Sequence, residues 1–432
     1  MLCPTLVVCL ILDQSKTITE KDLTASEKSN IGMPVITDCK YVGSYNWMDV
    51  GRTPTILVPG MPPAWTPLEE PKQLEEDAGQ YYRDPNAAHY PEYPIEPAAR
   101  AIFAHDASFS TNEADIFACG STLGNLLRFV RKMDKPFRFT VEVVGNTVFF
   151  VRRENSPTEV IPGVRGYGHT FPEAYTTWEE NTKGSQSHQR LVKYNFSGLN
   201  CIVRSESDGY LKDLDPDPSA HETSSLHPAS PMETRLELQA GGRLVPQEAL
   251  FDLKTRSVKR KDRDVLGEEV GRLWVSQTPN FILAYHDRGL FDDIVVQNIR
   301  KDIDKWEAEN QDTLRQLAAL VRQIAAIAKS RVDGRVEVRR KDIDVLEIRE
   351  QMSDAPTALP DELKLRWAAA ATEKPPDSSD DASIGDENDK QYLSSDEDFD
   401  RDDPWLGSDD ESDRDYTACS ADDCGYCGHC RY

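Results

Sequence analysis

The feature that most limits what this chain can fold into is a change of composition near residue 374. From Lys374 to Tyr432 the sequence carries 19 acidic and 5 basic residues and few large apolar side chains. A segment of this kind buries too little apolar surface to offset the entropy lost on ordering. We therefore expect residues 371–418 to form a disordered acidic tail. Folding is then confined to one globular domain at residues 41–370, preceded by a loose segment at residues 1–40.

The net charge of -25 is concentrated in this tail. Residues 374–432 carry -14 of it, which leaves -11 for the other 373 residues. An acidic folded part argues against non-specific wrapping of nucleic acid, which needs a positive surface. The basic run from Lys254 to Arg263 is still compatible with a local groove. A tail of this kind is most often a solvated extension, and docking on a basic protein partner is the functional alternative.

No segment of the sequence is predicted to cross a membrane. The apolar run from Leu2 to Leu12 is too short for a bilayer, and it lacks the basic start and cleavage site of a secretory signal. The cysteines outside the C-terminal end lie in apolar contexts that are typical of buried free thiols, which fits a reducing compartment. We therefore expect an intracellular protein, nuclear or cytoplasmic. These cysteines are Cys3, Cys9, Cys39, Cys119 and Cys201.

The cysteine-rich end at residues 419–432 is a candidate zinc site. Cys424, Cys427 and Cys430 follow one another at the Cys-x-x-Cys spacing of zinc ligands, and Cys419 is a fourth thiol nearby. The spacing is tight, because three of the thiols lie within seven residues. Redox sensing and adventitious metal binding are the competing interpretations of the same pattern.

Hydrophobic patterning predicts an α/β or α+β domain with a mixed, curved sheet flanked by helices. A helix begins near Ser121, where apolar residues recur on one face, and a hairpin follows with its turn at Gly145-Asn146. The longest helix is expected from Asp302 to Lys329, and Asp333-Gly334 is expected to turn a last hairpin. The other predicted elements are strands at 199–203, 236–238, 249–253 and 281–285 and a helix at 265–274.

Four charged side chains lie on or beside two of these strands. Glu206 and Asp208 follow the apolar run that ends at Val203, and Asp252 and Lys254 lie together further along the chain. Residues two apart on a strand project to the same face, so each pair points together. Carboxylates from adjacent strands can hold Mg or Mn, and a nearby lysine can stabilise an anionic transition state. The competing interpretation is that Asp252 and Lys254 are ordinary edge-strand charges.

An acidic residue followed by (Asp/Glu)-x-Lys on a neighbouring strand is typical of metal-dependent nucleases with a PD-(D/E)XK core. Several segments also resemble the eukaryotic decapping/exoribonuclease family, whose members remove aberrant 5′ caps or pyrophosphate from RNA. Glu206-Ser207-Asp208 resembles the family's Glu-x-Asp, and Asp252-Leu253-Lys254 resembles its Glu-x-Lys. The resemblance extends by order of elements over residues 41–300.

This resemblance implies a set of site residues. The Gly-aromatic segment that starts at Gly166 and ends at Glu173 resembles a further family motif, and so does the segment Leu273 to Gln277. By resemblance, Lys254 and Gln277 would act on the substrate, around a Mg or Mn ion. The implied metal ligands are Glu173, Glu206, Asp208 and Asp252.

Two positions depart from the family's pattern. Cys119-Gly120 stands where the family has Arg-Gly before the first helix, so a phosphate-contacting arginine is missing there. The glutamate of Glu-x-Lys is Asp252 here, which is one methylene shorter. Two functions therefore stay open: a metal-dependent phosphohydrolase acting on RNA 5′ ends, and a catalytically degenerate scaffold or binding protein of the same fold.

The chain also resembles a group of filamentous-fungal proteins that are often labelled geranylgeranyl pyrophosphate synthetase. The matching stretches include Ser44 to Trp47, Thr55 to Gly60 and Leu126 to Val130. Prenyl synthases are all-helical and hold magnesium with two Asp-rich motifs. The match to such a motif here is Asp409 to Asp413, inside the predicted disordered tail. The residues therefore give this third alternative little support.

Overall fold

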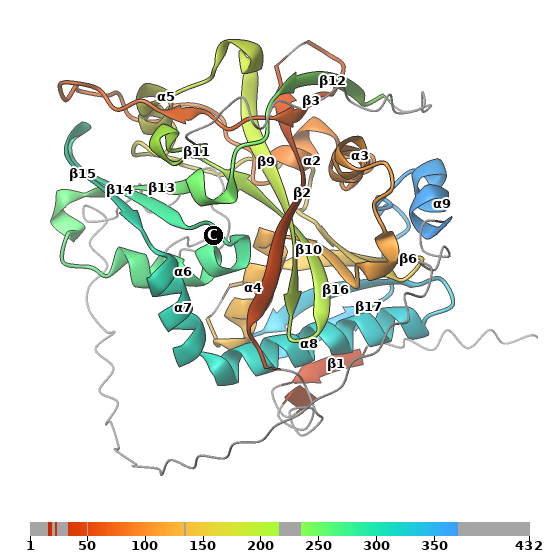
Figure 1. Cartoon of the computed structure of the whole chain (residues 1–432). Helices are drawn as coiled ribbons and strands as arrows, with labels where there is room; N and C mark the ends of the chain where they lie inside the picture. The colour runs from red at the N-terminus through yellow and green to blue at the C-terminus, as the bar shows by residue number, and fades with distance from the viewer. Residues whose placement is uncertain are drawn as a thin grey trace, which may run out of the picture.

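The computed structural model describes residues 16–19, 22–23, 33–49, 51–133, 135–215 and 235–369. Within these residues, two β-sheets of mixed strand direction are flanked by helices (Figure 1). The predicted mixed α/β class is confirmed, although the strands form two sheets rather than one.

The larger sheet has eleven described strands, with β10 (Leu199–Ser207) near its centre. β10 pairs parallel with β5 and antiparallel with β9. Cys201 and Val203 pack into one apolar core and Ile202 into another, as expected for a strand covered on both faces. Across the sheet the strands are β1 (Lys16–Thr19), β17 (Val345–Arg349), β16 (Arg335–Asp342), β6 (Arg138–Val144), β7 (Thr147–Arg152), β5 (Ile116–Cys119), β10, β9 (Ser185–Phe196), β2 (Ile36–Met48), β3 (Thr55–Gly60) and β12 (Glu237–Gly242).

The predicted curvature is present in this sheet. Strand β2 pairs with β9, but its register shifts near Thr37, Tyr41 and Trp47. Irregularities of this kind bend a strand and increase its twist. The long strand β2 therefore curves while it stays hydrogen-bonded to its neighbour.

The smaller sheet is entered directly from the larger one. β10 ends at Ser207 and β11 begins at Gly209, so Asp208 lies at the crossing. Gly209 is required there, because a Cβ would lie 2.3 Å from the ring of Phe251. Across the sheet the described strands are β15 (Leu290–Asn298), β14 (Asn280–Asp287), β13 (Leu250–Ser257), β11 (Gly209–Tyr210), β4 (Ala64–Trp65) and β8 (Thr176–Thr177).

Most of the helices cover the strands through two apolar cores, and α5 packs on the smaller sheet through a third. The first core takes α4, α6, α7 and α8 together with strands of both sheets, and the second takes α3 and α9 (Figure 1). Val203 of the larger sheet and Phe281 of the smaller sheet belong to the same core, so the two sheets are packed as one unit. The helices are α2 (Pro85–His89), α3 (Glu96–His105), α4 (Gly120–Val130), α5 (Thr170–Tyr175), α6 (Val265–Ser276), α7 (Arg300–Glu309), α8 (Gln311–Ser330) and α9 (Asp361–Ala369).

Two sequence predictions about the end of the domain were wrong. The predicted single helix is divided at Asn310, which has φ -110° and ψ 25° and donates its side-chain amide to the Trp306 carbonyl. This local hydrogen bond competes with continuation of the helix. Asp333-Gly334 leads from α8 into β16, and the hairpin of β16 and β17 turns at residues 343–344 instead.

Part of the predicted loose segment is also ordered. β1 pairs antiparallel with β17, and its Ile18 is fully buried in the first core. Strand β2 begins at Ile36, also within the segment predicted to be loose. The predicted acidic tail at 371–418 and the cysteine-rich end at 419–432 lie outside the described residues. None of the described helices is long and apolar enough to cross a membrane.

Trp367 anchors the last helix, and its removal tests the second core. Its fully buried ring lies 5.3 Å from Phe149 and 5.7 Å from Phe103 between centroids, and its indole donates to Thr147 Oγ1. We expect Trp367→Ala to lower the free energy of unfolding by roughly 3–5 kcal/mol, measured by chemical denaturation. Leu365→Ala on the same helix is the control, since Leu365 is 73% exposed. Equal losses in the two variants would contradict this packing.

Candidate functional site

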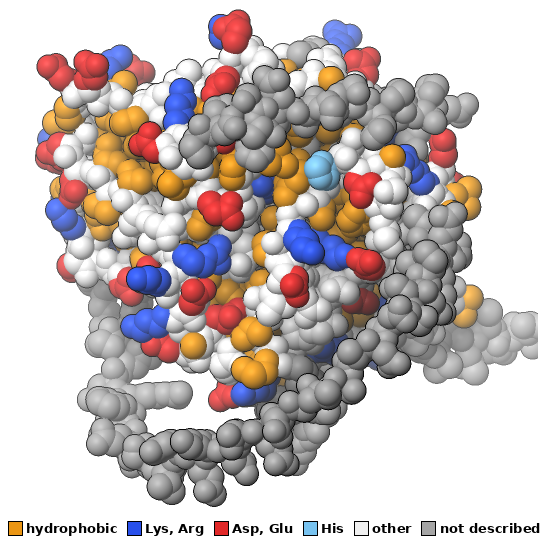
Figure 2. Space-filling model, in the orientation of Figure 1, with side chains coloured by type: hydrophobic (Ala, Val, Ile, Leu, Met, Phe, Trp, Pro, Cys, Tyr) orange, Lys and Arg blue, Asp and Glu red, His pale blue; other side chains and the backbone are white. Residues whose placement is uncertain are grey.

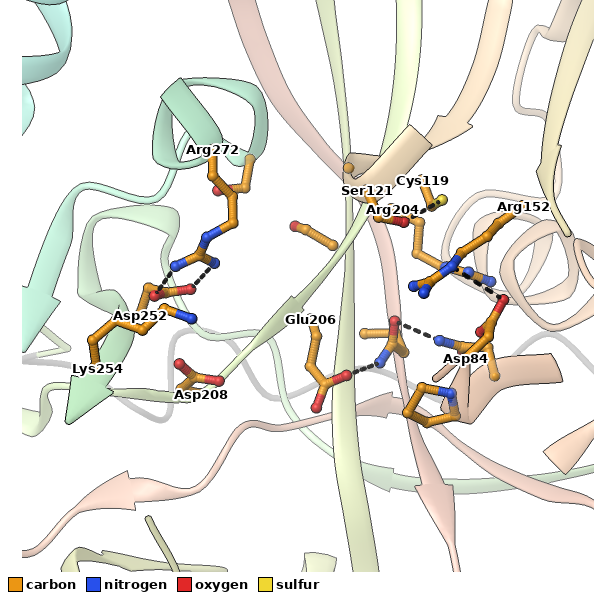
Figure 3. A pocket seen from close by; sticks show the side chains of 16 residues that line it. Asp84, Cys119, Ser121, Arg152, Arg204, Glu206, Asp208, Asp252, Lys254 and Arg272 are labelled. Atoms are coloured by element: carbon orange, nitrogen blue, oxygen red, sulfur yellow. Dashed lines mark hydrogen bonds and ion pairs between the residues drawn. The ribbon is translucent and has the colours of Figure 1, made fainter. Parts of the chain in front are cut away.

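A pocket opens where β10 leaves the larger sheet and faces β13 of the smaller one (Figure 3). The N-terminus of α4, the end of β7, one face of α6, the start of α2 and Gln189 of β9 also line it. Four acidic and four basic side chains line it, and Figure 3 shows them in two groups. On the surface view, basic and acidic side chains alternate rather than forming one continuous basic face (Figure 2).

The first group is positively charged and surrounds the start of α4. Arg152 of β7 and Arg204 of β10 lie beside Cys119 and Ser121, and Asp84 lies next to the arginines. Cys119 is the residue before α4 and is not a side-chain cap for the helix. Unpaired N–H groups and the helix dipole make such an end attractive to anions. This half of the pocket is therefore suited to a phosphate or carboxylate.

The arginines of this group are fixed by partners that leave them charged. Arg152 donates from Nε to Glu154 at 2.7 Å, and Arg204 donates from Nη1 to the Pro94 carbonyl at 3.3 Å. Burial lowers the pKa of Arg152, but Asp84, Glu154 and Cys119 outweigh burial and raise it overall. Both guanidinium groups therefore present permanent positive charge to the pocket.

The second group contains the predicted carboxylates. Asp208 accepts a 2.7 Å hydrogen bond at Oδ2 from the backbone N–H of Leu253, and Glu206 accepts one of 3.2 Å from the Gln189 amide. Asp252 is held differently: both of its oxygens accept from the two terminal nitrogens of Arg272 on α6 (Figure 3). Lys254 is buried beside them, with 4% of its surface exposed.

A buried carboxylate holds Arg272 in place. Nε of Arg272 donates to Glu269 at 3.0 Å, and Arg256 lies 3.5 Å from the other oxygen of Glu269. Burial raises the pKa of Glu269, but Lys254, Arg272 and Arg256 outweigh it and lower the pKa to about 2. Glu269 is therefore ionised at neutral pH and 1% exposed. The cluster forms a continuous chain of alternating charges from Arg256 to Asp252.

Four of the predicted site residues meet in this pocket, and two do not. Glu206, Asp208, Asp252 and Lys254 line it. Glu173 lies on α5, outside the lining. Gln277 ends α6 with φ 55°, where its amide donates to the Trp274 carbonyl and accepts from Arg300. The left-handed turn at this helix end directs Gln277 away from the pocket.

The described residues do not fit a divalent ion as they are arranged. Among them, no group of three or more His, Cys, Asp and Glu side chains is placed to hold a metal. The reason lies in the partners: Asp252 is occupied by a guanidinium, and Glu173 is on another element. The Mg or Mn ion therefore stays a prediction. The candidate zinc ligands Cys419, Cys424, Cys427 and Cys430 lie outside the described residues.

Four further charged residues of the lining were not predicted. Arg204 stands two residues before Glu206 on the same strand, so the two-residue period could have found it. Arg152 and Asp84 come from distant segments that only the fold brings together. No sequence pattern could have found Arg272, because the pattern predicts a helix at this position but not that the helix lies opposite Asp252.

A family model described as a domain of unknown function (DUF8563) matches residues 18–367. No curated protein matches the chain by sequence. Among solved structures, S. pombe Rai1 in complex with 3′-FADP is 11% identical, with a TM-score of 0.54 over 78% of this chain and 100% of that chain. Scheffersomyces stipitis Rai1 in complex with (3′-NADP)+ and calcium is 12% identical, with a TM-score of 0.53 over 85% and 100%. Candida albicans Rai1 in complex with pU5-Mn2+ is 11% identical, with a TM-score of 0.50 over 83% and 100%.

At this identity the likeness to Rai1 establishes the fold. The resemblance of the core to the decapping/exoribonuclease family is thereby confirmed as a structural one. The label geranylgeranyl pyrophosphate synthetase has no support, because the core is built on two sheets rather than on helices alone.

The charge chain around Glu269 makes stability depend on pH. The pKa of Glu269 falls from an ordinary 4.5 to about 2 on folding, which corresponds to about 3 kcal/mol of stability. This contribution is complete above pH 4.5 and is lost as the pH falls toward 2. We expect Glu269→Gln to lower the free energy of unfolding by about that amount at pH 7. The deficit should shrink below pH 4.5, measured by urea denaturation across pH.

Glu268→Gln is the matched control for this prediction, because Glu268 is the preceding residue of α6 and is exposed. Its substitution should change stability little at any pH. A pH-independent deficit in Glu269→Gln, or the same deficit in both variants, would show that the charge chain does not carry the effect.

Proposed function

The chain belongs to the DUF8563 family, and we propose that its pocket binds the phosphorylated 5′ end of an RNA chain. The observation that carries the proposal is the positive half of the pocket. Arg152, Arg204 and the first turn of α4 converge there on one space. Guanidinium groups and helix N-termini are both common phosphate-binding groups, and together they favour an anionic ligand over a neutral one.

The negative half of the pocket favours a nucleotide over free phosphate. Asp208 lies across from the arginines and Glu206 lies between the two groups (Figure 3), and both carboxylates accept hydrogen bonds. Ribose hydroxyls donate such bonds, and the 2′-hydroxyl distinguishes RNA from DNA. A phosphate on the arginine side with a ribose on the carboxylate side satisfies both halves. The ligands of the Rai1 structures, which are 3′-FADP, (3′-NADP)+ and pU5, are of this chemistry and support the proposal.

Hydrolysis of the bound end is a second candidate function. It is favoured by Glu206, Asp208 and Lys254, which line one wall of the pocket as the Glu-x-Asp and (Asp/Glu)-x-Lys pattern predicts. A carboxylate can orient and deprotonate a water molecule, and the buried lysine can stabilise charge on the phosphate. Binding alone, by a catalytically degenerate protein of the same fold, is the alternative. Intracellular residence and a basic partner for the tail stay predictions.

The binding proposal is tested by placing a negative charge at the helix end. We expect wild type to bind a short RNA with a 5′-phosphate at least about tenfold more tightly than the same RNA with a 5′-hydroxyl, measured by fluorescence anisotropy. Ser121→Asp should remove most of this preference, because the new carboxylate repels phosphate. The helix itself tolerates an acid in its first turn.

Thr313→Asp is the matched control, since it adds the same charge in the first turn of α8, away from the pocket. It should bind like wild type. Equal affinity of wild type for the two RNAs would contradict the proposal.

The hydrolysis candidate is decided separately with 5′-triphosphate RNA and capped RNA, with and without Mn2+. Asp208→Asn keeps the shape of the side chain and removes its charge, so it should abolish any release of pyrophosphate or nucleotide. If folded wild-type protein binds RNA but releases neither product, hydrolysis is excluded and binding is the function.

A further inference from the structure

We infer that Arg272 is the resident cation of this pocket, and that its guanidinium takes the place of a divalent metal ion at Asp252. The pocket would then accept a phosphorylated ligand with no metal bound. The ligand part of this inference rests on the proposed function, whereas the metal part concerns the protein alone.

The first support is the geometry at Asp252. Both carboxylate oxygens accept hydrogen bonds from Arg272, which is a bidentate pair (Figure 3). A bidentate guanidinium–carboxylate pair is among the strongest polar contacts in proteins, and it uses the same oxygens that a metal would need. A divalent ion could bind Asp252 only after Arg272 had moved away.

The second support is that a second carboxylate, Glu269, also holds the Arg272 guanidinium. Its Nε donates to Glu269, which is 1% exposed and also contacts Arg256. Removal of Arg272 would leave two buried carboxylates with one partner fewer, which is costly in a protein interior. The guanidinium is therefore bonded on both of its sides, and all of these contacts lie within the fold.

The third support is the close packing of α6 against α4 and α7 beside Arg272. A Cβ at the neighbouring Gly271 would lie 3.3 Å from Leu127 of α4 and 3.3 Å from Trp306 of α7. Leu273 and Trp274, which follow Arg272 in the sequence, are 0% and 2% exposed. The helix is packed on both sides of this glycine, so its register toward Asp252 is fixed.

The fourth support is the charge of the lining. The four acidic groups, including Asp252, are balanced by four basic groups, including Arg272, so the pocket is neutral as it stands. Sites for hard divalent ions gather an excess of carboxylates that the ion neutralises. A metal ion here would leave two positive charges without a counterion until an anionic ligand arrived.

The test is Mn2+ binding by the full chain, followed through the electron paramagnetic resonance signal of free Mn2+. The acidic segment 374–432 is expected to bind Mn2+ weakly, so the readout is the difference between variants rather than total binding. We expect wild type and Asp252→Asn to give the same isotherm, which means that Asp252 holds no metal. One additional Mn2+ per chain in wild type, lost in Asp252→Asn, would overturn the inference.

Substitution of Arg272 supplies the converse. Arg272→Gln should gain one Mn2+ site, and the double variant Arg272→Gln with Asp252→Asn should lose it. Arg272→Lys keeps a positive charge and should gain none. Failure of folded Arg272→Gln to gain a site would overturn the role of the guanidinium as the group that excludes the metal. Circular dichroism melting curves identify any variant that does not fold.

Measurement of RNA binding is the last test of the inference. Affinity for the 5′-phosphorylated RNA should be unchanged between EDTA and Mn2+, and an increase of tenfold or more with Mn2+ would contradict the inference. If wild type binds this RNA in neither buffer, the proposed function fails. The Mn2+ isotherms of wild type and Asp252→Asn still decide the role of Arg272 in that case.

Discussion

The pocket depends on the way the chain leaves the larger sheet. After Ser207 the backbone passes through Asp208 into the smaller sheet, and Gly209 permits the close approach to Phe251. The Asp208 carboxylate then accepts from the N–H of Leu253, which ties the crossing to β13. A side chain that joins two sheets in this way has little freedom, so the residues on either side of it keep their relative positions. The carboxylate wall of the pocket is thus also a structural joint.

The two halves of the pocket have different electrostatic designs. Around α4 the arginines are paired to Glu154 and to the Pro94 carbonyl, and the lining carboxylate of Asp84 lies 4.0 Å from Arg152. Two guanidinium charges against one lining carboxylate leave a net positive charge available to an anion. Around Asp252 the charges are paired with each other, through Arg272 and Glu269. The first arrangement suits recognition of an anion, and the second stabilises the charged cluster itself. This contrast is the physical reason to separate binding of an RNA end from metal-dependent hydrolysis of it.

Sequence patterns predicted the parts of the site that lie on two strands. The apolar runs ending at Val203 and around Leu253 placed Glu206, Asp208, Asp252 and Lys254 correctly in one pocket. They could not show Arg152, because the parallel order β7, β5 and β10 follows from long-range pairing.

Local backbone conformation accounts for the other differences between prediction and structure. Gln277 does not line the pocket, because a left-handed helix end turns it toward Arg300. The two-sheet division was not predictable either, since it depends on a crossing one residue long.

The position of Arg204 and Glu206 on a single strand has a consequence for the kinds of molecule that fit. Same-face neighbours on a strand are separated by two residues, or roughly 6–7 Å along its axis. β9 pairs with β10 at both residues, and β5 pairs with it as far as Arg204, so this spacing cannot stretch without breaking the pairing with β9. The strand therefore fixes the distance between an anion-binding group, Arg204, and a hydrogen-bond acceptor, Glu206. A ligand can contact both residues only if its own charged group and hydroxyl group are separated by a matching distance.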